Sequence, residues 1–213
     1  KNAELRVQMP IAAGVTYEEM AKRIALKSGG VSCSLAAGLT ADGRKTWQKM
    51  IFRVRALHRN VPSALEILFD LLSQGDLSDA GRMRDLLFEM RNRLHAAVVP
   101  SGHIFAQRSA AAAQTLPAYL DELWHGRSQL QVLATAADSF ADRQGDLVGR
   151  VEALRELIFR QGGVTANLTA DDGGLQILEE NLAPMLRRLR GGSLVVTSAP
   201  VTSSPVSAGV AVP

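Results

Sequence analysis

The sequence is poor in cysteine and in aromatic residues. Its single cysteine, Cys33, excludes a disulfide within the chain and fits a reducing compartment or indifference to redox conditions. Because Cys33 lies on the apolar side of a predicted strand, we expect a buried residue rather than a reactive thiol. Aromatic residues make up 5% of the chain and are not interleaved with basic residues. That pattern argues against nucleic acid as a partner.

Long apolar runs and targeting signals are also missing. The apolar runs are short or interrupted by Arg and Gln, and none approaches the roughly 20 residues that a membrane-spanning helix requires. No secretory signal pattern is present, and we expect no membrane partner. The chain starts at Lys1 rather than at Met, which suggests a processed or excised piece whose native start lies upstream.

The composition is that of a globular protein. The 213 residues are 46% apolar, with 24 basic and 21 acidic residues and a formal net charge of +3. This length is sufficient for one sizeable core or two small ones, and the basic excess is mild.

The most informative stretch is residues 17–72. Helical spacing predicts a helix over residues 17–26, and Gly29 and Gly30 are expected to end it as left-handed caps. Alternation predicts strands over residues 31–39 and 50–56, joined by a turn at Asp42 and Gly43 and paired antiparallel. The following helix is predicted to begin near Asn60 and Pro62 and to bury a stripe of Leu65, Leu68, Phe69 and Leu72.

The rest of the chain is mainly helical. Apolar periodicity predicts helices over residues 79–98, 103–115, 117–125, 129–140 and 142–161, and another that starts at Asp171 and Asp172 and should be kinked or shortened by Pro184. Strands are predicted over residues 164–169 and 193–198, followed by a flexible Ser/Val/Pro tail over residues 199–213. The fold class is therefore α+β, an antiparallel sheet with helices packed on one face plus a helical subregion.

Several runs together resemble a known family. These are YEEMAKRIALKSGGVSCSL, the later VPSGHIFAQRSAAA, and DELWHGRSQLQVL, with the best signals at Tyr17, Gly29-Gly30, Ser101-Gly102-His103 and Glu122 to Gly126. The chain resembles the pitrilysin/insulinase clan of zinc metallopeptidases, and within it the presequence-protease branch. The resemblance implies a LuxS/pitrilysin-like half-domain over residues 1–198, from the third-domain region of a clamshell enzyme. It also implies a cytoplasmic location of bacterial type, or an organellar matrix.

The catalytic motif of that clan is missing from this sequence. The motif is His-x-x-Glu-His, in which two imidazoles bind zinc and the carboxylate between them acts as general base. None of His58, His95, His103 and His125 begins it, and no two histidines are four residues apart. Neither a Gly-x-Ser-x-Gly nucleophile motif nor a phosphate-binding loop occurs. We therefore predict no catalytic, cofactor-binding or metal-binding residue here, and zinc only in the full-length enzyme.

Four residues remain as structural or substrate-contact candidates: Gly29, Gly30, Gly102 and His103. His103 follows a glycine-containing turn at a predicted helix start, where backbone N–H groups can bind an anion. The alternative is that His103 packs against or caps a helix junction. For His125, beside Glu122 and Trp124, we expect a role at a helix C-terminus.

The resemblance implies a noncatalytic internal domain of a zinc-dependent peptidase that degrades unfolded peptides such as targeting presequences. Its partners would be the remaining domains of the same peptidase and those peptides. Two alternatives stay open. One is a paralogous subunit that has lost its zinc ligands. The other is a helix-rich interaction module, which would expose the apolar stripe of Met83, Leu87, Met90 and Leu94.

Overall fold

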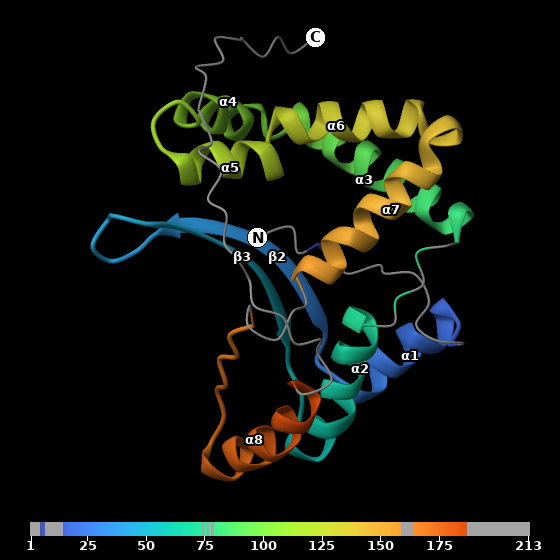
Figure 1. Cartoon of the computed structure of the whole chain (residues 1–213), viewed down its shortest axis with the longest axis vertical. Helices are drawn as coiled ribbons and strands as arrows, with labels where there is room; N and C mark the ends of the chain where they lie inside the picture. Colours follow the sequence, from blue (N-terminus) through green and yellow to red (C-terminus); the bar gives the residue numbers. More distant parts are fainter. Residues whose placement is uncertain are drawn as a thin grey trace. The chain divides into compact units, whose positions relative to one another are not determined.

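The computed structural model describes residues 5–6, 15–73, 75, 77, 79–158 and 164–186. Three strands and eight α-helices lie in these ranges (Figure 1), and the α+β prediction is confirmed. The elements are β1 (Leu5–Arg6), α1 (Tyr17–Lys27), β2 (Val31–Leu39), β3 (Thr46–Val54), a 3-10 turn (His58–Asn60), α2 (Val61–Ser73), α3 (Ala80–Val98), α4 (Gly102–Ala111), α5 (Leu116–His125), α6 (Arg127–Asp138), α7 (Phe140–Ile158) and α8 (Asp172–Leu186).

Contacts between residues divide the chain into two compact units. Unit 1 comprises Lys1–Cys33, Phe52–Ala80 and Gly145–Thr197, and Unit 2 comprises Ser34–Ile51, Gly81–Gln144 and Ser198–Pro213. The base of the β2–β3 hairpin thus belongs to Unit 1 and its tip to Unit 2. The single domain expected over residues 1–198 stays a prediction.

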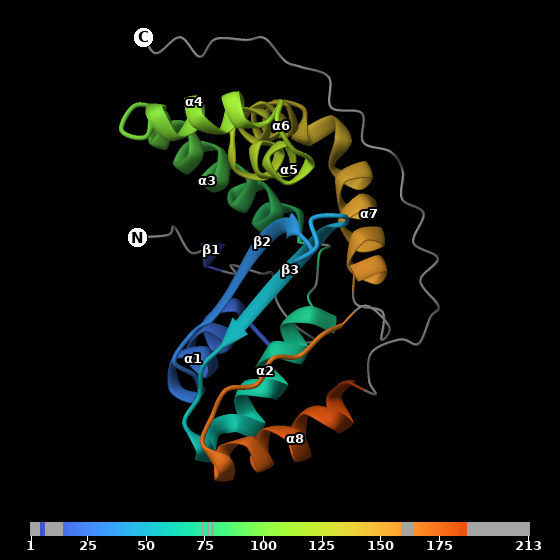
Figure 2. The same cartoon turned by 90° about the vertical axis from the view of Figure 1, so that its left-hand side faces the viewer.

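The sheet has the order β1-β2-β3, and Leu5 of β1 lies opposite Cys33 in an antiparallel pair. β2 and β3 form the predicted hairpin (Figure 2), with a turn at Gly43, whose φ of 69° favours glycine. β3 begins at Thr46 rather than at residue 50, because Trp47 continues the hairpin. Its indole Nε1–H donates to the Leu39 carbonyl at 3.0 Å, and its ring covers Gly38 so closely that a Cβ there would lie 2.5 Å away.

The end of α1 differs from the prediction. The helix starts with a capping box between Thr16 and Glu19 and ends at Lys27, where extended Ser28 donates its hydroxyl to the Ile24 carbonyl at 2.7 Å. The expectation that Gly29 and Gly30 end this helix as left-handed caps is therefore wrong. Gly30 does have a positive φ of 111°, but Gly29 donates its N–H to the Arg55 carbonyl at 2.7 Å, beyond the end of β3.

Helix α2 carries the core of Unit 1 because two of its faces are buried. One face places Val61, Leu65 and Phe69 against Met185 of α8. The other places Ile67, which is 0% exposed, and Leu71 against Met20 of α1. The predicted stripe named Leu65, Leu68, Phe69 and Leu72; three of these are buried and Leu68 is half-buried. A single-stripe pattern missed Ile67 and Leu71.

Helix α8 begins as predicted. The Asp171 carboxylate accepts from the Gly174 N–H at 2.8 Å and lies 3.2 Å from the His58 imidazole. The helix runs through Pro184 to Leu186, the last residue described. The strand predicted over residues 164–169 is wrong: these residues have no regular structure and are mostly exposed, so their alternation has no buried side to stabilise. The predicted strand 193–198 and tail 199–213 lie outside the described residues.

Unit 2 contains α3 to α6 and the start of α7. Its apolar side chains are buried one or two to a helix: Leu87 in α3, Phe105 in α4, Leu120 in α5, Leu133 and Ala137 in α6, and Phe140 in α7. The predicted helices of this region are confirmed, with α4 ending at Ala111 rather than at residue 115. Among the helices described, none is long and apolar enough to cross a membrane.

Candidate functional site

Helices α5 and α6 meet at one shared residue. Thr115 starts α5 by accepting from the Ala118 N–H at 3.2 Å, and the helix runs to His125. Gly126 then serves both as the C-cap of α5 and as the N-cap of α6. The chain therefore turns from one helix into the next within a single residue.

Glu122 fixes this turn from inside the unit. It is 6% exposed, and its carboxylate accepts from the backbone N–H of Ser128 at 3.1 Å and from the hydroxyl of Ser128 at 2.6 Å. This places a negative group at the N-terminus of α6, where the helix dipole favours it. Gly126 is required for the approach, because a Cβ there would lie 2.6 Å from the Glu122 carbonyl oxygen and 2.9 Å from its Oε1.

A second polar cluster ties α4 to α5. Arg108 of α4 donates from Nε to the Asp121 carboxylate at 2.9 Å and from Nη1 to the His125 carbonyl at 3.1 Å. The other carboxylate oxygen of Asp121 lies 2.9 Å from Nδ1 of His125. His125 does lie in the last turn of α5, as predicted, and its ring contacts this carboxylate.

These donors do not fit the zinc ion that the family resemblance implies. Asp121 and His125 are engaged with a guanidinium, whose positive charge opposes a cation, and Glu122 is occupied by Ser128. In the part of the chain that the structure describes, no group of three His, Cys, Asp or Glu side chains is placed to hold a metal ion.

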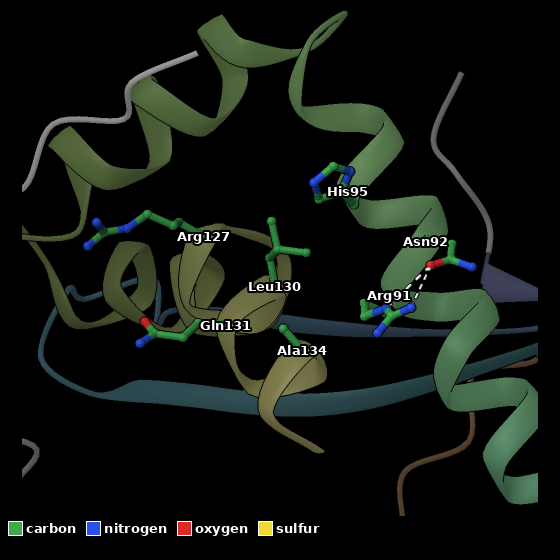
Figure 3. Close-up of a pocket in the computed structure, with 7 residues that line it drawn as sticks. All are labelled: Arg91, Asn92, His95, Arg127, Leu130, Gln131 and Ala134. Carbon is green, nitrogen blue, oxygen red and sulfur yellow. Dashed lines mark hydrogen bonds between the residues drawn. The ribbon is translucent and has the colours of Figure 1, made fainter. Parts of the chain in front are cut away.

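A groove of about 640 Å³ lies between α3 and α6, lined by Arg91, Asn92, His95, Arg127, Leu130, Gln131 and Ala134. We call it the α3–α6 groove. Figure 3 shows that its lining comes from these two helices, with Leu130 between them and the His95 ring directed toward α6. Its lining has basic, amide and aliphatic side chains but no carboxylate.

The basic side chains of the α3–α6 groove differ in how they are held. The Phe88 ring contacts the guanidinium of Arg91 at 4.6 Å and that of Arg84 at 5.2 Å. Arg91 also lies 3.5 Å from Asp138, a carboxylate that is 76% exposed. The Nε of Arg127 is buried and has no hydrogen-bond partner among the described residues.

The predicted candidates lie elsewhere. Gly102 begins α4 and exposed His103 follows it, while the Ser101 carbonyl accepts from the Ile104 N–H at 2.9 Å. Gly29 and Gly30 connect α1 to β2 in Unit 1. None of the four lines the α3–α6 groove, and their contact with substrate stays a prediction. Sequence reasoning missed the groove because Arg91 and Arg127 belong to helices that pair only in three dimensions.

Comparison with known proteins identifies the family. A sequence model for the peptidase-associated region of metallopeptidase family 16, subfamily C, matches residues 12–135, more than half of the chain. The chain belongs to this family. The matched range extends from α1 into α6 and includes both the Glu122 junction and the α3–α6 groove.

The relatives bear out the resemblance to the presequence-protease branch. The chain is 28% identical over 145 residues to a mitochondrial presequence protease of Danio rerio, covering 63% of this chain and 14% of that protein. It is 30% identical over 165 residues to one of Emericella nidulans, covering 73% and 16%. A protein called HypA from Clostridium perfringens is 20% identical over 173 residues, covering 81% and 18%. The chain therefore spans about one sixth of the length of these relatives.

Proposed function

We propose that this chain is a noncatalytic part of a zinc-dependent peptidase of the presequence-protease type. It would wall the enclosed space in which unfolded peptides, such as targeting presequences, are held for cleavage. Other domains of the same protein would supply the zinc ion, whose role is to activate the water that attacks the peptide bond. The relatives' names support the activity class, and their greater length is consistent with the reactive metal being held elsewhere.

One observation carries the noncatalytic role. The carboxylates and the imidazole at the α4–α5–α6 junction are held by Arg108 and Ser128, which act as structural partners. A general base needs a lone pair directed at substrate or water. Asp121, Glu122 and His125 instead direct theirs at groups that join helices.

The burial of α3 argues against the interaction module. That function needs an exposed apolar stripe of Met83, Leu87, Met90 and Leu94. Leu87 is 8% exposed and the other three are half-buried. The stripe is therefore largely used within Unit 2. The alternative of a zinc-less paralogous subunit shares all these features and differs only in the remaining domains.

The names of several relatives place those proteins in mitochondria, which supports an organellar matrix for this chain. The expected cytoplasmic location has no support from those names. The single cysteine suits either reducing compartment.

Photo-crosslinking tests the chamber role. An unstructured peptide of about 20 residues carrying a benzophenone side chain is mixed with the chain, and the labelled residues are mapped by mass spectrometry. A folded protein with the same probe on its surface is the control. We expect labelling within residues 15–138 by the peptide alone. Equal labelling by the folded protein, or no labelling by the peptide, would contradict a surface that selects unfolded chains.

A further inference from the structure

We propose that the α3–α6 groove binds a carboxylate-bearing segment of an unstructured peptide, an Asp or Glu side chain or a terminal carboxylate. This inference names a subsite of the proposed function and relies on that function only for the ligand being a peptide. The ligand class itself follows from the charge, the shape and the unsatisfied donor of the groove.

Charge is the first argument. The groove is lined by two guanidinium groups, Arg91 and Arg127, and by the imidazole of His95, with the amides of Asn92 and Gln131 and no acidic residue. The carboxylates nearest to these residues in the fold are already engaged. Glu122 is bonded to Ser128, and Asp138 lies 3.5 Å from Arg91 in an exposed pair. The lining therefore favours an anion.

The unsatisfied donor is the second argument. The Nε of Arg127 is buried without a hydrogen-bond partner among the described residues, although buried donors are normally paired. A guanidinium presents donors in a planar fork that matches the two oxygens of a carboxylate. A ligand carboxylate beside Arg127 can supply acceptors that the fold does not.

The third argument is how Arg91 is held. Phe88, three residues earlier on α3, contacts its guanidinium at 4.6 Å, and Asn92 accepts from its Nε and Nη2 at 3.3 Å. These contacts reduce the rotamer freedom that Arg91 would otherwise lose on binding. Leu130 and Ala134 provide an apolar floor for the methylene groups of the ligand. The Ser128 N–H is already capped by Glu122, so the side chains rather than the start of α6 hold the carboxylate.

The test compares matched fluorescent peptides. One is a 15-residue unstructured peptide with Asp and Glu at alternate positions, the second carries Asn and Gln instead, and a single-stranded oligonucleotide of equal negative charge is the competitor. Fluorescence anisotropy with the full chain measures binding. We expect the acidic peptide to bind at least about tenfold more tightly than the amide peptide, to weaken with added salt, and to resist competition by the oligonucleotide.

Variants locate the site. Arg127→Gln and Arg91→Gln should each weaken binding of the acidic peptide by about three- to tenfold. Arg59→Gln removes the same charge from an exposed position in Unit 1 and should change nothing. His95→Gln, an exposed residue that need not affect folding, should weaken binding in the same direction, and circular dichroism monitors the fold of each variant.

Three results would overturn the inference. They are equal binding of the acidic and amide peptides, a loss with Arg59→Gln as large as with Arg127→Gln, and displacement of the peptide by the oligonucleotide at lower concentration. The proposed function can survive any of them, because peptides of other composition can still be crosslinked. Conversely, a failed crosslinking experiment with a retained acidic preference would reject the chamber and leave the groove.

Discussion

The two units of the chain are stabilised by different interactions. In Unit 1, α2 buries apolar side chains on two faces, against α1 and against α8, in two continuous clusters. In Unit 2, buried apolar residues are distributed thinly over α3 to α7, and polar clusters around Glu122 and Asp121 fix how α4, α5 and α6 meet. Unit 1 thus depends on packing volume, whereas Unit 2 depends on the exact placement of a few polar groups.

The largest effect is expected from Ile67→Ala in Unit 1. Ile67 is 0% exposed, so removing its side chain leaves a cavity that costs about 2–5 kcal/mol of unfolding free energy. Leu133→Ala in Unit 2 should cost less, because Leu133 lies in no continuous cluster of buried residues among those described. Urea unfolding followed by circular dichroism measures both, with Leu57→Ala, at a 61% exposed position, as the control. A larger loss for Leu133→Ala would reverse the comparison.

Gly126→Ala tests the polar junction. The added methyl would lie 2.6 Å from the Glu122 carbonyl oxygen, and forcing backbone groups apart costs about 1–3 kcal/mol. Gly145→Ala is the matched control, because it lies in α7 with nothing within 4 Å of an added Cβ. It should stabilise the chain by about 0.5–1 kcal/mol through helix propensity. Thermal unfolding separates the two; the same sign for both would show that the close approach is unimportant.

Glu122→Gln should have a smaller effect. The amide keeps the size of the side chain but replaces a charged acceptor with a neutral one at the start of α6, a loss of about 1 kcal/mol. Glu152→Gln on the exposed side of α7 removes the same charge and should be close to neutral. Urea unfolding of the two variants measures the difference. If both lose stability equally, the effect comes from net charge and not from the junction.

The smallest effect concerns Cys33 at the base of β2. Burial raises the pKa of its thiol from 9.0 to about 11. Because the native pKa is the higher one, this contribution to stability is complete below pH 9 and is lost as the pH rises toward 11. At pH 8 the native thiol should react with a maleimide far more slowly than the unfolded chain. Labelling at the unfolded rate would show that Cys33 is accessible, and Cys33→Ala should remove the alkaline loss.

Much of the fold followed from local sequence patterns. Apolar period, glycine and proline positions placed α2 to α7 and the β2–β3 hairpin, because each of these elements is specified by residues close in sequence. The errors came from non-local structure. Residues 164–169 alternate like a strand but have no regular structure, and α2 buries a second face that one helical stripe does not reveal.

The candidate site was less accessible from sequence. The run around Glu122 and Gly126 carried the family resemblance, and the structure gives a physical reason for that residue combination: a glycine lets a buried carboxylate cap the next helix. The α3–α6 groove was missed because Arg91 and Arg127 are 36 positions apart and each reads as part of a solvated helix. Only the packing of α3 near α6 brings them to one groove.

Hydrolysis of an unstructured peptide tests the central claim most directly. The purified chain is incubated with a peptide of about 20 residues, with added Zn²⁺ or with a chelator, and the products are identified by mass spectrometry. If the reactive metal is held elsewhere, the peptide stays intact in both samples. Fragments that form only with Zn²⁺ and increase with chain concentration would show that this chain carries its own catalytic centre.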